Sequence, residues 1–251
     1  MILKTEAFVL KSFDFRETSR IATFFTKEHG KVSGVLKGIR RDPKKFGSSL
    51  ELFSVNDIVF YQYRNSDLHL ISQCDLKQFF FSVRQDLKKS LAAHYIVDLV
   101  NAVMPAEEKN QRVYTLMTDF FQALESAHPV NALVHFFQIK ILQYSGFKPH
   151  LDTCVKCRRR IRSRARFSLN DGGLVCDDCR IVESLVHYIS PGSVASILHI
   201  EQNSWEACLR LKLSAQAQEE IKYTLNHFLV YHLGRRLKSE KFLSSGPSRN
   251  Y

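Results

Sequence analysis

Hydrophobic positions in the first eighty residues follow a strand-like pattern. Short runs rich in β-branched and aromatic residues recur, and turn-forming stretches at 29–31 and 64–67 separate them. The runs read AFVLKSF, RIATFFTK, KVSGVLKG, SVNDIVFYQY and LHLISQC. Five short strands in so few residues predict a small barrel, and the OB-fold is the smallest common form. The pattern by itself leaves an SH3-like barrel open.

The spacing of apolar residues changes to a helical period after residue 80. Apolar residues recur every four positions from Leu87 to Leu99, which predicts an amphipathic helix that ends before Pro105. Ser190 followed by Pro191 has the pattern of a helix N-cap and a first-turn proline. The other helices are predicted at 109–127, 130–145 and 214–239.

These patterns predict an α+β protein of several domains. A small N-terminal β-barrel is followed by an α-helical region, and a module with four cysteines is inserted into the helical part. The expected bounds are 1–80 for the barrel, 81–149 and 186–243 for the bundle, 150–185 for the module, and 244–251 for a disordered tail.

The excess of positive charge indicates what kind of partner the protein binds. The 251 residues include 36 lysines and arginines against 25 acids, a formal net charge of +11. Such an excess favours a polyanionic partner, with nucleic acid first and an anionic membrane surface or acidic protein behind it. The sequence shows neither a signal-peptide core nor an apolar run that could span a bilayer, so we expect a cytoplasmic protein with reduced thiols.

Four of the six cysteines form two pairs. Cys154 and Cys157 make one C-x-x-C motif, Cys176 and Cys179 make the other, and 18 residues separate the pairs. This spacing predicts a structural zinc site, in which four thiolates close a tetrahedron and leave no position for substrate. Disulfides do not suit a reducing compartment, whereas an iron–sulfur cluster remains an alternative. Cys74 and Cys208 lie in apolar segments and are predicted to be core residues.

Two basic clusters are candidates for contact with phosphates. Each could equally be a solvated charge run. Phe46 lies near the first cluster and could stack on a base. The first cluster, between two predicted strands, contains Lys37, Arg40, Arg41, Lys44 and Lys45. The second, between the cysteine pairs, contains Arg158, Arg159, Arg160, Arg162, Arg164 and Arg166.

Several segments together resemble the RecO family of recombination mediators. The N-terminal pieces are VLKSFDFRETS, FTKEHGK and LKGIRR; the middle pieces are GFKPHLDTCVKC and FSLNDGGLVCDDC; the last is LVYHLGRRLKSEKFL. The resemblance runs in order along nearly the whole chain. It implies an N-terminal OB-fold, a helical bundle and a four-cysteine zinc module. It also implies a nucleoid-associated DNA repair protein that binds single- and double-stranded DNA and anneals complementary strands.

The resemblance also implies partners. The family acts with RecR, contacts the acidic tail of single-strand-binding protein, and so helps the RecA recombinase onto coated DNA. DNA contact by the arginines of the zinc module is inferred from their charge, not from the family. We expect no enzymatic activity, because the K-x-D-G context of a DNA ligase and the common phosphate-loop, protease and hydrolase motifs are missing. The alternative is a zinc-containing OB-fold protein that binds RNA or ribosomes.

Overall fold

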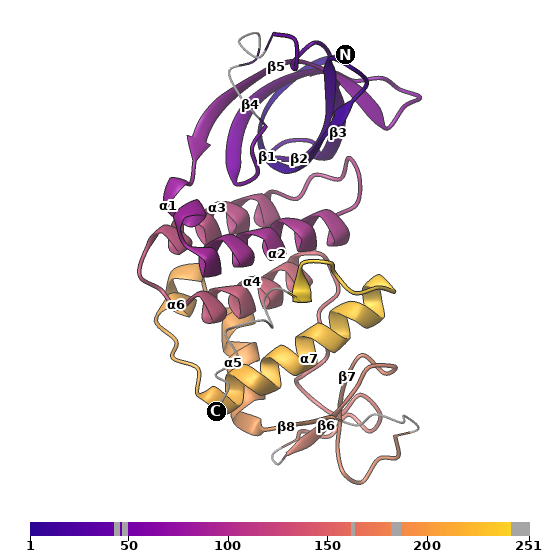
Figure 1. Ribbon diagram of the computed structural model, residues 1–251. Helices are drawn as coiled ribbons and strands as arrows, with labels where there is room; N and C mark the ends of the chain where they lie inside the picture. Colours follow the sequence, from indigo (N-terminus) through magenta and orange to yellow (C-terminus); the bar gives the residue numbers. More distant parts are fainter. Residues whose placement is uncertain (43–45, 47–49, 162–163, 182–186, 242–251) are drawn as a thin grey trace. The chain divides into compact units, whose positions relative to one another are not determined.

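The computed structural model describes residues 1–42, 46, 50–161, 164–181 and 187–241 (Figure 1). The chain divides into two compact units. One comprises Met1–Ala127 together with Lys238–Tyr251, and the other comprises His128–Leu237. Each unit is described by itself below. Among the helices of the described ranges, none combines the length and apolar character that crossing a bilayer requires.

The N-terminal part of the first unit is a closed five-stranded barrel (Figure 1). Its strands follow the order β1-β2-β3-β5-β4, in which only β3 and β5 pair in parallel. This closure is that of an OB-fold, so the fold class predicted from the strand pattern is confirmed. The strands are β1 Ile2–Phe15, β2 Ser19–Thr26, β3 Gly30–Leu36, β4 Ser54–Tyr61 and β5 Leu68–Phe79.

The run AFVL in β1 explains how the barrel is joined to helices of the same unit. Ala7 and Val9 point into the barrel core, whereas Phe8 contacts Phe80 and Phe121 on the other side of the strand. A strand buried on both faces reads as a continuous apolar run and not as an alternation. Helices α1 Phe81–Gln85, α2 Leu87–Val103 and α3 Gln111–Glu125 follow β5.

The described residues of the second unit form four helices and a small sheet. Helix α4 spans Val130–Tyr144, and α5 Pro191–Gln202 begins at Ser190, whose hydroxyl accepts a hydrogen bond from the backbone N–H of Ser193. This N-cap was predicted and is confirmed. The remaining elements are β6 Ala165–Ser168, β7 Gly173–Val175, β8 His187–Ile189, α6 Trp205–Leu209 and α7 Ala215–Leu233.

The final helix is shorter than the predicted 214–239. It ends at Gly234, whose φ of 65° lies in the left-handed region that terminates helices. The helical period continues past this glycine in the sequence, but the backbone does not follow it. Leu237 and Ser239 are nonetheless buried, and the Ser239 hydroxyl donates a hydrogen bond to Asp98 of α2 within the first unit.

Candidate metal centre and nucleic-acid surfaces

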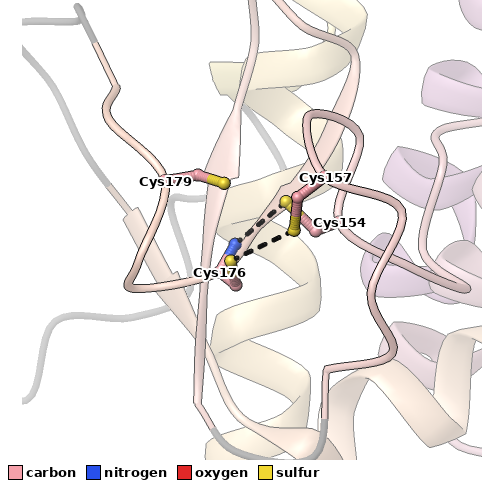
Figure 2. Close-up of side chains that lie close together, drawn as sticks. All are labelled: Cys154, Cys157, Cys176 and Cys179. Carbon is pink, nitrogen blue, oxygen red and sulfur yellow. Dashed lines mark hydrogen bonds between the residues drawn. The ribbon is translucent and has the colours of Figure 1, made fainter.

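The two C-x-x-C motifs meet in space (Figure 2). One sulfur from each of Cys154, Cys157, Cys176 and Cys179 lies within 4.8 Å of the other three. The Sγ atoms of Cys157 and Cys176 are 3.7 Å apart, and the backbone N–H of Cys176 donates to Cys154 Sγ. The structure therefore brings together the four cysteines that the spacing singled out. Cys74 and Cys208 are buried elsewhere, as predicted for core residues.

The backbone of each motif turns tightly, which directs its two sulfurs to one side. In the first motif the N–H of Arg158 donates to the Cys154 carbonyl, and the N–H of Cys154 donates to the Arg159 carbonyl. Arg158 adopts a φ of 62°, the left-handed conformation that lets the chain double back. In the second motif the N–H of Cys179 donates to the Cys176 carbonyl.

Strand β7 connects the two motifs. The N–H of Val155 donates to the Leu174 carbonyl, and the N–H of Leu174 donates to the His150 carbonyl. This close approach requires Gly173, because a Cβ at that position would lie 2.4 Å from the His150 carbonyl oxygen. Cys176 follows the strand directly, so the register of β7 against residues 150–155 sets the distance between the two cysteine pairs.

We expect Gly173→Ala to loosen the module by about 1–3 kcal/mol, the usual cost of forcing an extra methyl group into a packed site. Hydrogen exchange at the amides of Val155 and Leu174 measures the effect, and both should exchange faster. Gly192→Ala is the matched control, since a Cβ there meets nothing within 4 Å. Equal exchange in both variants would show that the close approach does not hold the motifs.

Hydrogen bonds bias the thiols of Cys154 and Cys157 toward the ionised form that metals require. Burial opposes ionisation of Cys154, but the backbone N–H groups of Cys157, Cys176 and Lys156 outweigh it and lower the pKa of its thiol to about 6. The backbone N–H of Arg159, with its guanidinium, lowers the pKa of Cys157. Hydrogen bonding with Cys176 raises the pKa of Cys179 to about 12. Without a cation, four adjacent thiolates cannot all be charged.

The cluster fits a tetrahedral metal ion. With metal–sulfur bonds of about 2.3 Å, neighbouring sulfurs in a zinc tetrathiolate lie roughly 3.8 Å apart. The 3.7 Å between Cys157 and Cys176 matches this spacing. Four thiolates are the donor set typical of zinc or an iron–sulfur cluster, and they leave no open coordination position for chemistry on a substrate.

The arginines between the cysteine pairs divide into exposed and internal side chains. Arg158, Arg159, Arg160 and Arg164 are exposed, whereas Arg162 lies outside the described residues. Arg159 pairs with Asp178 at 3.2 Å, and its hydrogen bond to Cys157 raises its own pKa. Arg159 therefore donates to a cysteine sulfur, a contact that supports the cluster itself.

Arg166 has an internal role that the sequence did not predict. Its Nη2 atom donates to the carbonyls of Cys176, Asp177 and Cys179 at 2.7, 3.0 and 2.7 Å, and only 18% of its side chain is exposed. The guanidinium thus holds the second cysteine motif against strand β6. No sequence pattern distinguishes this arginine from its neighbours, because the contacts are with backbone atoms.

The first basic cluster lies in the connection between strands β3 and β4. Lys37, Arg40 and Arg41 are exposed, and Lys44 and Lys45 lie outside the described residues. The expectation that Phe46 stacks on a base is wrong. Its side chain is only 3% exposed and packs in the barrel core with Ile39 and Leu50, because the open end of the barrel needs an apolar cover.

The connection between β1 and β2 extends this cluster. Arg20 and Arg40 both contact Asp14, at 2.9 and 3.4 Å, and the N–H of Arg40 donates to the Thr18 carbonyl. The Arg20 guanidinium, with Arg40 behind it, lowers the pKa of Asp14. Arg20 was not among the residues predicted from the sequence. We use the term barrel surface for the described basic residues Lys11, Arg16, Arg20, Lys37, Arg40 and Arg41.

A bulge in β1 turns an aromatic residue outward beside these charges. Val9 pairs with Phe24 and Lys11 pairs with Thr23, so Leu10 is an extra residue and the alternation reverses there. Phe13 therefore points outward, 43% exposed, in a cross-strand row with Ile21 and Val35. The Lys11 ammonium lies 5.2 Å from the Phe13 ring centroid.

Comparison with known proteins covers the whole of this arrangement. Residues 1–80 match the family model described as Recombination protein O N terminal, and residues 84–241 match the model described as Recombination protein O C terminal. The boundary between the two models falls directly after strand β5, at the start of the helical region.

Curated relatives match over nearly their full length, and each is named DNA repair protein RecO. The protein of Alkaliphilus metalliredigens is 29% identical over 94% of this chain and 95% of its own length. That of Moorella thermoacetica is 28% identical over 99% and 96%. That of Syntrophus aciditrophicus is 30% identical over 96% and 94%. An OB-fold barrel, a helical region and both family models thus agree, and the chain belongs to the RecO family of DNA repair proteins.

Proposed function

We propose that this chain is a non-enzymatic DNA-binding mediator of recombinational repair in the bacterial cytoplasm, associated with the nucleoid. It binds single- and double-stranded DNA and anneals complementary strands. The observation that carries the proposal is the exposed ring of Phe13, which lies in an outward row with Ile21 and Val35 and has the Lys11 ammonium 5.2 Å from its centroid. Exposed aromatic and apolar side chains beside lysines and arginines are what single-stranded nucleic acid requires for stacking and for its phosphates.

The barrel surface would track one strand. Phosphates contact Lys37, Arg40 and Arg41, and the ring of Phe13 is free to meet a base on the face that Lys11 does not cover. Such contacts carry no sequence preference, because every phosphate and every base ring offers the same chemistry. Asp14 holds Arg20 and Arg40 in fixed positions, so the basic side chains lose less freedom when DNA binds.

The four-cysteine module would supply a second surface. We assign a structural zinc ion to Cys154, Cys157, Cys176 and Cys179, where it replaces the apolar core that so short a segment cannot build. The exposed Arg158, Arg160 and Arg164 then contact phosphates of a second strand. Neutralising two strands on one molecule lowers their mutual repulsion, which speeds pairing.

Family membership supports the partners that we assign. The chain would act with RecR and contact the acidic tail of single-strand-binding protein, for which its net charge of +11 provides electrostatic attraction. Competition for that tail would weaken the hold of single-strand-binding protein on DNA. RecA could then assemble on the strand that is released.

Strand annealing tests the proposal directly. The protein should accelerate pairing of complementary DNA strands more than pairing of RNA strands of the same sequence. Replacing Arg158, Arg160 and Arg164 by glutamine should lower the annealing rate more than it lowers affinity for one strand, because only pairing needs both surfaces. Zinc content is measured on the same sample to establish that the module is intact.

The control removes equal charge elsewhere. Lys88, Arg210 and Lys212 are exposed and belong to neither surface, and their joint replacement by glutamine gives a control triple variant. It should anneal nearly as fast as the parent protein. A stronger effect on RNA than on DNA would instead support the RNA-binding alternative, and equal annealing by both triple variants would remove the module from the mechanism.

A further inference from the structure

Strand β8 places two consecutive aromatic side chains on opposite faces of the small sheet. The strand lies at the sheet edge, in the order β7-β6-β8. His187 pairs in register with Phe167, and both rings contact helix α7, through Tyr223 at 4.0 Å and Phe228 at 5.8 Å. This face of the sheet is therefore covered by the helix. Successive side chains of a strand point to opposite faces, so Tyr188 points away from α7.

Tyr188 lies on the same face as two arginines of the module. Its partner in register is Arg166, and Arg164 lies two residues earlier, directly before strand β6. The Arg164 guanidinium carbon lies 4.7 Å from the Tyr188 ring centroid. The tyrosine is still 39% exposed. An arginine stacked on an exposed ring fixes the orientation of that ring and leaves its other face for a ligand.

The position of this ring is tied to the cysteine cluster. Arg166 holds the carbonyls of Cys176, Asp177 and Cys179, and its strand neighbour is Tyr188. The exposed Arg158, Arg159 and Arg160 directly follow the first cysteine motif, and Arg159 reaches Asp178 of the second. A planar ring thus lies against the exposed Arg164 guanidinium, a pair that is complementary to a strand with negative phosphates and flat bases.

We propose that Tyr188 is a base-stacking residue for single-stranded DNA. A base stacks on the ring face opposite Arg164, and Arg164 binds an adjacent phosphate. The four-cysteine module would then contact bases as well as backbone. This inference rests on the proposed function, which assigned only phosphate contacts to the module, and it adds a contact that duplex DNA cannot make with its bases paired.

Tyr223 provides a matched comparison. It is a tyrosine of the same unit and is 38% exposed, but its ring is stacked between His187 at 4.0 Å and His227 at 3.9 Å. Both faces of the Tyr223 ring are occupied by protein, so a base has no face on which to stack. From their exposed fractions alone, Tyr188 and Tyr223 should stack equally well on a base. From their ring contacts, only Tyr188 should do so.

The experiment compares Tyr188→Leu, Tyr188→Phe and Tyr223→Leu in the full chain with its metal retained. Two ligands are used: an oligothymidylate, and an abasic phosphodiester strand of the same length that lacks bases. Affinities are measured in the parent background and in a background with Lys37, Arg40 and Arg41 replaced by glutamine, where the module provides a larger share of binding.

Tyr188→Leu should weaken oligothymidylate binding about five-fold or more, the lower end of what one base–aromatic stack contributes. Its affinity for the abasic strand should be unchanged. Tyr188→Phe should restore oligothymidylate binding, because it keeps the ring, and Tyr223→Leu should match the parent on both strands.

Two results overturn the inference while leaving the proposed function intact: an equal loss on both strands, which indicates a structural or electrostatic effect, or a loss of equal size in Tyr223→Leu. Unchanged affinity of Tyr188→Leu in the background without the three barrel charges also overturns it. A parent protein that binds neither strand would instead overturn the proposed function, and this inference with it.

Discussion

Cys176→Ser protein is expected to lose its metal, whereas the parent chain should carry about one zinc ion per molecule. Cys176 contributes to the cluster twice. Its sulfur lies 3.7 Å from that of Cys157, and its backbone N–H donates to Cys154 Sγ. Three thiolates and a hydroxyl hold zinc far less tightly than four thiolates do. In an intact structural site, zinc binding contributes about 10–16 kcal/mol to the free energy of folding, so most of this stabilisation should be lost.

Elemental analysis and hydrogen exchange measure the two consequences. The variant should contain little zinc, and amides of residues 150–181 should lose protection while those of the barrel keep theirs. Cys208→Ala is the control, because Cys208 is buried in the same unit but its thiol donates to the Ile200 carbonyl and takes no part in the cluster. Parent protein with no zinc, or with iron and a visible absorption band, would contradict the assignment.

The second large effect is on the salt dependence of DNA binding. Replacing Lys37, Arg40 and Arg41 by glutamine should flatten the slope of log affinity against log salt on single strands by up to about 2 units, since each phosphate contact contributes roughly 0.7. Arg40 shares Asp14 with Arg20, so its removal leaves that carboxylate to Arg20 alone. The loss of affinity should be largest at low salt, where screening is weakest.

Binding titrations at several salt concentrations measure this slope for the barrel variant, the control triple variant and the parent. The control removes the same number of charges, so it separates a local phosphate contact from a change in net charge. A slope that is the same in all three proteins would mean that the barrel surface faces solvent when DNA is bound. Equal flattening in both variants would point to net charge instead.

Sequence pattern alone determined the order and type of the main elements. Alternating and β-branched runs gave the five barrel strands, and the helical period gave α2, α3 and α4 with nearly their observed bounds. These features are local, because strand and helix periods depend on neighbours two to four residues apart. The cysteine spacing likewise identified the four sulfurs that meet, since a C-x-x-C turn fixes two of them locally.

Only the tertiary structure decided which side chains of each cluster face outward. The bulge at Leu10 reverses the alternation of β1, so Phe13 points outward although a strict period from Ala7 and Val9 would bury it. Phe46, in contrast, is buried because the barrel end needs an apolar cover. One extra residue in a strand sets the orientation of Phe13, whereas Phe46 is buried by packing against residues distant in sequence.

The arginines of the module show the same division most sharply. In the sequence they are equivalent positive charges, but their contacts in the structure differ. The Arg166 guanidinium donates to three backbone carbonyls. Arg159 pairs with Asp178, and Arg164 lies over the ring of Tyr188. These differences arise because the partners are carbonyls, a carboxylate and a ring, brought close by the pairing of β6 with β8 and by the meeting of the cysteine motifs. Charge is a property of composition, whereas its availability to a partner depends on contacts that form only when distant segments fold together.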